Sequence, residues 1–287
     1  MRTSLLLLAA AVAFGQTGQP ALKFDAASVK PAKPLMPDAS GVMRAMGPTG
    51  GPGTSDPSRF RFPPITLRLL LMTAYDLKPF QIVGPAWIDS EYFEVEGTAP
   101  PATTREQSRV MLQNLLTERF QMTLHRETKE LPIYALVPAK NGPKLQESGA
   151  TSAGADGGPP PTEMKVGPDG FPVPPPGRAG LFGMSSGGRT RLIGQQQTMQ
   201  ALAARLTTQL ARLVRDETGL TGKYDFVLTY TPDSAELPPG SAAPPDGDQP
   251  PDLYAALQSQ LGLRLESKKG PVETIVIDRA EKVPVGN

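Results

Sequence analysis

The segment Thr66-Leu67-Arg68-Leu69-Leu70-Leu71-Met72-Thr73-Ala74-Tyr75 opens the stretch, Thr66 to Val137, that decides the fold. Its apolar positions 67, 70, 71 and 74 recur at the spacing of one helix face, which predicts an amphipathic helix. Short extended runs follow at 81–84 and 93–96, and the second alternates apolar with acidic residues as a half-buried strand does. The segment therefore predicts a helix that packs on a sheet.

The second half of this stretch predicts another helix and two more strands. An apolar stripe runs from Met111 to Phe120, and Thr103 and Glu106 stand before it at capping-box spacing. Two extended runs, 122–125 and 133–137, close the stretch, and we interpret Lys129-Glu130 between them as the turn of a hairpin. With a preceding strand at 59–62, the predicted order is strand, helix, strand, strand, helix, strand, strand.

The same order returns, shortened, between residues 189 and 282. At a constant offset of 132, the places of Thr66, Leu67, Leu70 and Ala74 are taken by Thr198, Met199, Leu202 and Leu206. The run 224–226 corresponds in the same way to 93–95, although its offset is one residue smaller. Chance similarity between two amphipathic series is the alternative, but agreement in both order and apolar positions favours an internal duplication.

These patterns predict an α+β protein of two related β-α-β-β-α-β-β units, with antiparallel or mixed sheets, helices packed on one face and long Pro/Gly-rich loops. We place the first unit at residues 22–143, with an irregular loop at 31–57, and the second at 189–282. A Pro/Gly-rich linker at 144–188 separates them, and a disordered insertion at 233–251 interrupts the second unit. The run 22–29 alternates as a strand that adds an edge to the first sheet.

The N-terminus has the pattern of a secretory signal peptide, which we place at residues 1–15. Arg2 precedes the apolar run Leu5 to Val12, and small residues near Ala13 offer cleavage sites. The apolar run is too short for a stable spanning helix, so no stable membrane insertion is expected. We therefore expect a periplasmic or secreted protein after cleavage of the signal.

Composition limits the partners and the chemistry. The chain has no cysteine, and its 29 basic and 28 acidic side chains give a net charge of +1. Without cysteine an exported chain has no disulfides, so buried apolar area must supply its stability. Such an even charge balance gives no electrostatic reason to expect nucleic acid as a partner. An envelope protein or a small ligand is the partner class that remains.

Most known catalytic arrangements are missing from the sequence. The single histidine, His125, lies in an alternating run and is expected on the wet face of a strand. One histidine and no cysteine exclude the common zinc and copper sites, and a Ser-His-Asp triad would have to use His125 itself. No GxSxG, HExxH or P-loop sequence is present. We predict neither a metal nor an organic cofactor.

Carboxylates are the remaining candidates for chemistry. Acidic residues cluster in each half of the chain, and they are Asp89, Glu91, Glu94 and Glu96 in the first half and Asp216, Glu217 and Asp225 in the second. Paired acids can hydrolyse a glycoside or hold calcium. The alternation of the acids with apolar residues at 93–96 is equally typical of a solvated strand face, and this interpretation is the one we favour.

Two turns carry the binding candidates Trp87, Asp89, Tyr224 and Asp225. Trp87, the single tryptophan, lies in the turn 84–89 that leads into the strand at 93–96. An indole there either recognises a ligand or anchors the turn on the core, and we favour the anchor. The matching turn, 219–224, carries two glycines suited to positive φ, with Leu220 as its anchor.

A succession of motifs over nearly the whole chain after the signal is similar to that of a known family. The motifs are KFDAASVKP at 23–31, AYDL at 74–77, GPAWI at 84–88, LHRETKELP at 124–132, TGLTGKYDF at 218–226 and ESKKGPVE at 266–273. They resemble an uncharacterised, soil-associated family that is expanded in acidobacteria of the Solibacter type, domain of unknown function 3738. A likeness in helix and strand order alone links each unit to the small N-terminal domains of secretins and outer-membrane receptors, as a fold analogy.

The resemblance implies exported proteins, often in many copies per genome, whose domain is sometimes attached behind membrane peptidases similar to antibiotic-sensing receptors. The family supplies no catalytic residue to carry over. The signal, the duplicated scaffold and the missing catalytic arrangements lead us to expect an extracytoplasmic binding, sensing or protein-interaction module rather than an enzyme. The alternatives are a secreted carboxylate-dependent hydrolase that uses Asp89, Glu94 or Asp225, and a structural envelope protein.

Overall fold

The structure is a computed structural model that describes residues 22–34, 48–149, 167, 170–171, 179–232 and 251–286. The predicted signal peptide at 1–15 lies outside the described residues, as do 233–250 of the predicted insertion and most of the predicted linker. The described part contains helices and sheets in a mixed α/β arrangement, in agreement with the predicted α+β class.

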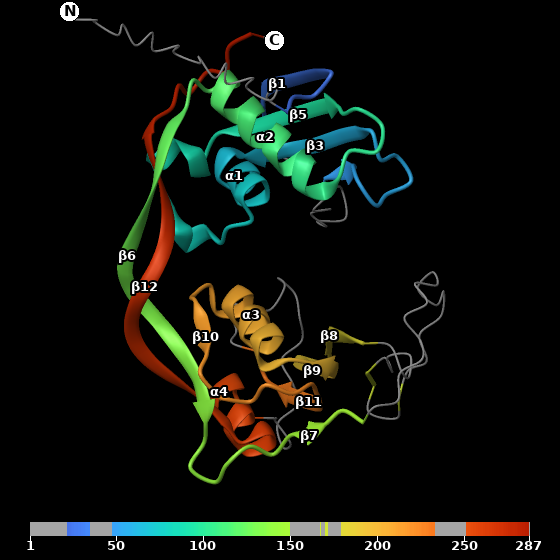
Figure 1. Cartoon of the computed structure of the whole chain (residues 1–287), viewed down its shortest axis with the longest axis vertical. Coiled ribbons are helices and arrows are strands. Elements are labelled where there is room, and N and C mark those ends of the chain that lie inside the picture. The colour runs from blue at the N-terminus through green and yellow to red at the C-terminus, as the bar shows by residue number, and fades with distance from the viewer. Residues whose placement is uncertain are drawn as a thin grey trace, which may run out of the picture. The chain divides into compact units, whose positions relative to one another are not determined.

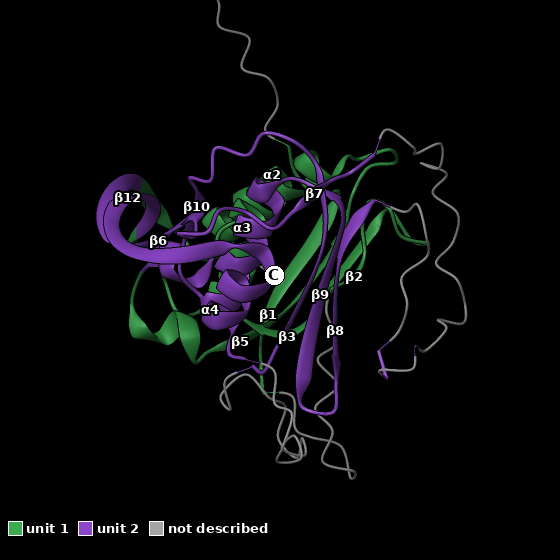
Figure 2. Cartoon of the chain, turned by 90° about the horizontal axis from the view of Figure 1, so that it is seen from below, with its two compact units in different colours: residues 1–77, 84–125, 277–287 green, residues 78–83, 126–276 purple. Residues whose placement is uncertain are grey.

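The chain forms two compact units, which Figure 2 shows in different colours. Unit 1 contains residues 1–77, 84–125 and 277–287, and unit 2 contains residues 78–83 and 126–276. These boundaries differ from the predicted 22–143 and 189–282. A short segment after the first helix belongs to unit 2 and the C-terminal residues belong to unit 1, because both segments are joined to strands that are distant in sequence.

Unit 1 is built on a four-stranded antiparallel sheet of order β1-β5-β3-β2 (Figure 1). Its strands are β1 (Ala26–Ala32), β2 (Thr49–Gly50), β3 (Arg59–Thr66) and β5 (Tyr92–Thr98). The strand predicted near 22–29 is β1, and it forms an edge of this sheet as expected. Along β5, Phe93 and Val95 are buried while Glu94 is exposed, so one face of the sheet carries the core.

Helices α1 (Leu67–Tyr75) and α2 (Arg105–Arg119) cover the apolar face of this sheet. The predicted face of α1, which comprises Leu67, Leu70, Leu71 and Ala74, is fully buried. The capping box of α2 is formed by Thr104 and Gln107, one residue later than predicted. Two short 3₁₀ turns, η1 (Pro79–Gln81) and η2 (Ala86–Asp89), flank strand β4 (Ile82–Val83) between α1 and β5.

The sequence predicts that each unit closes with a hairpin, but the structure has two long strands there, β6 (Thr123–Pro138) and β12 (Leu263–Arg279). Each runs without a turn, β6 through Lys129-Glu130, the pair expected at a hairpin tip, and β12 through Lys268-Lys269. They pair with each other in a mixed sheet of order β10-β6-β12-β4, with β10 at Val214–Asp216. Strand β10 is parallel to β6, and β4 is parallel to β12. Because each long strand has a long partner, no reversal of the chain is needed to complete its hydrogen bonds.

Unit 2 contains a second four-stranded antiparallel sheet, of order β7-β11-β9-β8. Its strands are β7 (Gln146–Glu147), β8 (Gly180–Ser186), β9 (Arg189–Gln197) and β11 (Tyr224–Tyr230). Strands β7 and β8 lie at the two ends of the range 144–188 in which the sequence predicts a linker. The apolar periodicity of both segments is too weak to predict a strand, because β7 has only two residues and β8 contains two glycines.

One face of this second sheet packs against helices α3 (Met199–Leu210) and α4 (Leu253–Ala256), and α4 continues into the π-helical turn η4 (Leu257–Leu261). Alternate residues of β11 are buried there, beginning with Tyr224, Phe226 and Leu228. The same core takes Leu202 and Leu206 from α3. The opposite face of the sheet, which we call the outer face, carries Asp225, Val227 and Thr229.

Candidate functional site

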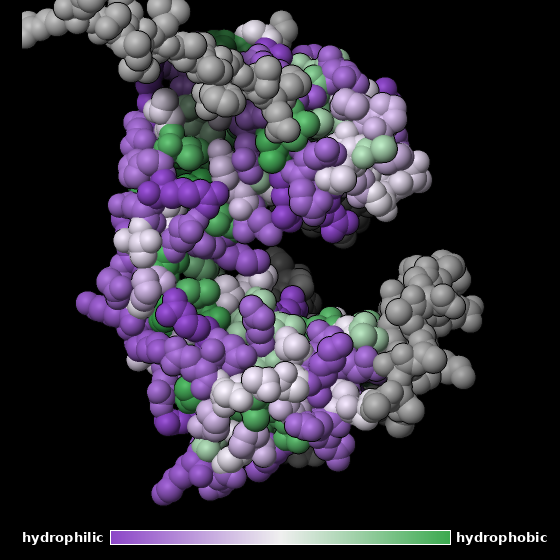
Figure 3. All heavy atoms as spheres, in the orientation of Figure 1, coloured by the Kyte–Doolittle hydropathy of each residue, from purple (hydrophilic) through white to green (hydrophobic). Residues whose placement is uncertain are grey.

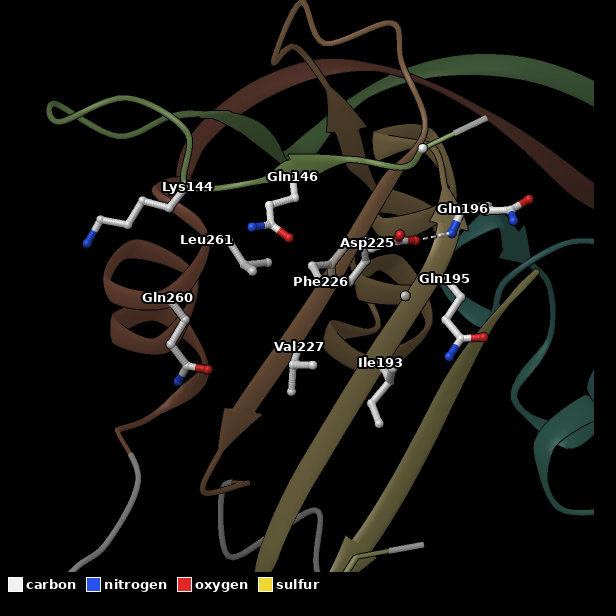
Figure 4. Close-up of a pocket in the computed structure, with 12 residues that line it drawn as sticks. Lys144, Gln146, Ile193, Gln195, Gln196, Asp225, Phe226, Val227, Gln260 and Leu261 are labelled. Atoms are coloured by element: carbon white, nitrogen blue, oxygen red, sulfur yellow. Dashed lines mark hydrogen bonds between the residues drawn. The ribbon is translucent and has the colours of Figure 1, made fainter. Parts of the chain in front are cut away.

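A groove of 690 Å³ opens in unit 2 beside β11, where the short strand β7 ends. Figure 4 shows that residues of β9 and β11 form its floor, η4 its wall on one side and the segment before β7 its upper rim. Its lining combines polar and apolar side chains, and the labelled members are Lys144, Gln146, Ile193, Gln195, Gln196, Asp225, Phe226, Val227, Gln260 and Leu261.

Asp225 is the carboxylate of this groove, and a β-bulge fixes its position. The pairing of β11 with β9 shifts between Tyr224 and Phe226, so two residues of β9, Gln195 and Gln196, lie opposite Asp225. Gln196 has φ 54°, a left-handed conformation that costs a non-glycine residue about 1 kcal/mol or more. This turn of the backbone directs the Gln196 N–H to Asp225 Oδ1 at 2.7 Å.

The second hydrogen bond to Asp225 comes from the segment that follows β7. The hydroxyl of Ser148 donates to the same Oδ1 at 2.9 Å. No described residue hydrogen-bonds to the other oxygen, Oδ2. The carboxylate is thus held through one oxygen while its second oxygen is open to accept a hydrogen bond in the groove.

Gln260 forms the opposite end of the groove. Its side-chain amide pairs with the backbone of β11 as a neighbouring strand would. Its Oε1 accepts from the backbone N–H of Thr229 at 2.9 Å, and its Nε2 donates to the Thr229 carbonyl oxygen at 2.7 Å. Strand β7 pairs with β11 only at Tyr224 and Asp225. Val227 lies between these two partners, and its side chain is 49% exposed.

The wall and the rim of the groove are tied together by close backbone packing. The backbone N–H of Lys144 donates to the Leu261 carbonyl oxygen at 2.8 Å, and the Lys144 ammonium donates to the Ser259 carbonyl oxygen at 2.9 Å. Gly262 ends η4 with φ 64°, and a Cβ there would lie 2.1 Å from the Gly142 carbonyl oxygen. Only glycine allows this approach, which keeps the rim against η4.

The arrangement suits recognition of a polar ligand that also has an apolar face. A carboxylate oxygen and amide groups accept and donate hydrogen bonds, and Ile193 and Val227 supply an apolar strip between them. Figure 3 shows that hydrophilic residues cover most of the face in view and that hydrophobic residues form small groups. Val227 is one of the few exposed large apolar side chains among the described residues, and it lies in this groove.

The predicted candidates in unit 1, Trp87 and Asp89, take part in structural contacts. The Trp87 ring is half-buried and lies 6.4 Å from the Phe120 ring, centroid to centroid. Asp89 accepts from Nε and Nη2 of Arg68, the second at 2.9 Å. The hydrogen bond from Arg68 lowers the pKa of the Asp89 carboxyl below its usual value.

The two predicted candidates in unit 2 separate although they are adjacent in sequence. Tyr224 is 5% exposed and belongs to the core beneath the sheet. Asp225 points to the outer face and into the groove, because successive side chains of a strand alternate between faces. Of the four predicted residues, the structure places Asp225 alone in the groove.

The other acidic residues take part in separate contacts. Glu91 pairs with Lys282, Glu96 with Arg61, and Glu217 with Lys268. Asp216 accepts from the backbone N–H and the hydroxyl of Thr218, at 3.0 and 2.8 Å. Within the described residues, no group of three or more His, Asp or Glu side chains is arranged to hold a metal ion. His125 Nδ1 lies 2.9 Å from Asp278 Oδ1, with both side chains about half exposed.

Sequence reasoning missed the amide side chains of the groove. Gln195 and Gln196 are part of the run Gln195-Gln196-Gln197, which ends the strand that begins at Arg189. Nothing in this run distinguishes a bulge from a regular strand end. Gln146 and Gln260 come from other segments and carry no sequence signal for a common site, because only the packing of η4 and β7 around β11 brings them together.

Comparison with known proteins identifies a family. Residues 68–280 match the family described as Protein of unknown function (DUF3738). No curated protein and no solved structure matches the chain. In the part of the chain that the structure describes, no helix has the length and apolar character needed to cross a membrane.

Proposed function

The chain belongs to the family of proteins of unknown function DUF3738, and we propose that it is an exported binding module whose ligand site is the groove at Asp225. The observation that carries the proposal is the way in which the carboxylate of Asp225 is held. A strained bulge and a serine hydroxyl hold one carboxylate oxygen, and the other oxygen faces the groove without a partner among the described residues. Strained backbone of this kind is concentrated at functional sites.

The chemistry of the lining restricts the ligand class. Asp225 Oδ2 selects for a group that donates a hydrogen bond, such as a hydroxyl, an amide N–H or an ammonium. The apolar strip of Ile193 and Val227 selects for a ligand with one hydrophobic face. Sugars, cell-wall fragments and peptides combine these features, so they are the substrate classes that the proposal favours.

Export and internal duplication belong to the same proposal. The signal pattern at residues 1–15 supports a periplasmic or secreted location, and the resemblance to a family expanded in acidobacteria agrees with it. The sheet orders β1-β5-β3-β2 and β7-β11-β9-β8 correspond strand by strand. In both, one helix lies before the last sheet strand in the chain, β5 or β11, and another follows it, which supports an origin by duplication. In this account the two units share a scaffold, and unit 2 carries the ligand site.

A carboxylate-dependent hydrolase receives no specific support from the geometry. Asp89 is held by Arg68, and Asp225 has two hydrogen-bond donors but no second carboxylate among the residues that line its groove. Hydrolysis of a glycoside by the usual route needs a pair of carboxylates a few ångströms apart. Binding without turnover is therefore the function we propose.

Thermal unfolding with a ligand panel tests this proposal. The chain from Gln16 onward would be heated with cell-wall fragments, sugars, peptides, β-lactams and divalent ions, one class at a time. A ligand at 100 times its dissociation constant adds about 2.7 kcal/mol to stability, which moves the midpoint of unfolding by several degrees. We expect a shift with a sugar, cell-wall or peptide ligand.

The variant Asp225→Asn makes the test specific to the groove. Asparagine retains an oxygen for Ser148 and Gln196, but it replaces the open oxygen with an N–H donor. We expect the variant to unfold at nearly the wild-type temperature without ligand and to lose the ligand-induced shift. Asp76→Asn, which removes an exposed carboxylate in unit 1, is the matched control and should retain the shift. A shift that survives in Asp225→Asn would refute the assignment of the site.

A further inference from the structure

We infer that the edge of β8 that no described strand pairs with, its free edge below, is a docking site for an extended segment of another protein, which adds to the sheet as a further strand and places an acidic side chain beside Arg205. This partner site is independent of the groove at Asp225. Strand addition to an open sheet edge is a common way for a domain to bind a peptide, because the main chain supplies the affinity and alternate side chains the specificity.

Strand β8 differs from the other sheet edges in its length and in its lack of protection. It ends the order β7-β11-β9-β8, and its seven residues, GLFGMSS, contain neither a charge nor a proline. Natural proteins usually protect edges with charges, prolines or very short strands. Strand β1 carries Lys30 and Pro31, and β2, β4, β7 and β10 have two or three residues each. Among the described strands, β8 is thus the long edge without such a device.

The register of the sheet identifies the backbone groups that an added strand would meet. Gln260 bonds both backbone groups of Thr229, so the odd-numbered residues of β11 point away from β9. Even-numbered residues of β11 and β9 then bond each other, and odd-numbered residues of β9 bond even-numbered residues of β8. The N–H and C=O groups of Leu181, Gly183 and Ser185 therefore point outward from the free edge.

Gly183 and Arg205 make this edge favour an added strand that carries a negative charge. Gly183 faces the helix side of the sheet, where a Cβ would lie 3.0 Å from Arg205 Nη2 of α3 and 3.9 Å from Leu192 Cδ1. Arg205 is exposed, and it has no hydrogen-bond or ion-pair partner among the described residues. A strand added beside β8 would bring its own helix-side residue next to this guanidinium. An Asp or Glu there would form an ion pair, and a Lys or Arg would be repelled.

The same charge argues against a second copy of the chain as the occupant. Antiparallel pairing of β8 with itself about Gly183 would bring the Arg205 residues of the two copies to the same point of the new strand pair. Like charges opposite each other destabilise a sheet. A partner segment with an acidic residue removes this conflict, so the geometry favours a different protein.

Two matched peptides test the inference with the chain from Gln16 onward. The peptides TVTETVT and TVTKTVT, blocked at both ends and labelled with a fluorophore, differ only in the central residue that would lie beside Arg205. We expect the Glu peptide to bind about five-fold more tightly than the Lys peptide, as measured by fluorescence anisotropy, because a partly exposed ion pair has an effect of this size. Arg205→Glu should reverse the preference.

Backbone pairing is tested by Gly183→Pro, which removes an outward N–H at an edge position where proline is tolerated. We expect this variant to bind neither peptide, with an unfolding temperature close to that of the wild type. It should also keep the thermal shift with the groove ligand, which separates this inference from the proposed function. The inference is overturned if neither peptide binds the wild type, if Gly183→Pro binds as the wild type does, or if sedimentation shows a dimer that this substitution dissociates.

Discussion

Gly262 is a residue at which the local backbone has little freedom. It combines φ 64° with a backbone oxygen, that of Gly142, 2.1 Å from the position of a Cβ. Gly187 provides a comparison, because it has φ 57° in a hairpin turn with no heavy atom within 4 Å of the Cβ position. The two glycines thus separate the strain of positive φ from the effect of close packing.

We predict that Gly262→Ala destabilises the protein by more than about 2 kcal/mol, whereas Gly187→Ala costs about 1 kcal/mol. The first substitution must displace the segment at Gly142 as well as adopt a left-handed conformation. Chemical denaturation of both variants checks the difference. Equal losses of stability would mean that the close approach to Gly142 does not restrict residue 262.

The ion pair of Arg68 and Asp89 gives a residue-scale prediction with a pH dependence. Because the hydrogen bond from Arg68 lowers the pKa of Asp89 below its usual value, the charged carboxylate is favoured in the folded state. The pair therefore stabilises the protein above the unfolded pKa, and this stability is lost as the pH falls through the lower, folded pKa. About half of the Asp89 side chain is exposed, so we expect a coupling of only about 0.5 kcal/mol at pH 7.

A double-mutant cycle with Arg68→Ala and Asp89→Asn measures this coupling. The free energy of unfolding of the four proteins should show the coupling at pH 7 and none near pH 2. A coupling that is unchanged at the acidic pH would show that the two side chains interact without the carboxylate charge.

At the residue scale, the sequence offers Tyr224 and Asp225 together as binding candidates, and the structure separates them. They are adjacent at the end of the turn that matches the one at Trp87. Alternation along β11 sends Tyr224 into the core and Asp225 into the groove. The partners of Asp225 come from a bulge and from the end of β7, and a left-handed Gln196 has no distinctive sequence pattern.

At the scale of elements, α1 and α3 begin in the same way. The side chain of Thr66 accepts from the backbone N–H of Leu69, and that of Thr198 accepts from the N–H of Ala201. We predict that Thr66→Ala and Thr198→Ala each destabilise the protein by about 1 kcal/mol, the usual cost of losing such a cap. Thr66→Ser and Thr198→Ser are the matched controls and should be nearly neutral. A loss at only one of the two sites would contradict the equivalence of the helices.

The helices were predictable because the period of their apolar residues is long and regular. The long strands were not, because glycine and proline in Gly270-Pro271 resemble a turn signal. In the structure Gly270 lies inside β12, and a Cβ there would lie 2.5 Å from Ile133 Cδ1. This glycine serves close packing between strands, and sequence alone does not distinguish that role from a turn.

At the scale of the whole molecule, the sequence separates the chain into consecutive halves, while the structure exchanges segments between its units. Strand β4, from between α1 and β5, pairs with β12, and β10 pairs with β6. Such pairings join residues almost 200 positions apart, as Ile82 and Ile275 are. Hydrophobic periodicity carries no information about which distant strand a short strand joins.

Export is a prediction at the same scale. We expect the full chain, produced in a bacterium, to accumulate outside the cytoplasm with an N-terminus near Gln16. Leu7→Arg should keep the protein in the cytoplasm with an intact Met1, because it places a charge in the apolar run of the signal. Fractionation followed by N-terminal sequencing measures both outcomes. A wild-type chain that stays uncleaved in the cytoplasm would contradict the prediction.

The central claim, that unit 2 binds a ligand through the groove at Asp225, is tested most directly by amide hydrogen exchange. Exchange would be compared with and without the panel compound that gives the largest thermal shift. We predict slower exchange at 195–197 and at 225–227, where the bulge and β11 form the floor of the groove. Protection confined to other segments would contradict the claim.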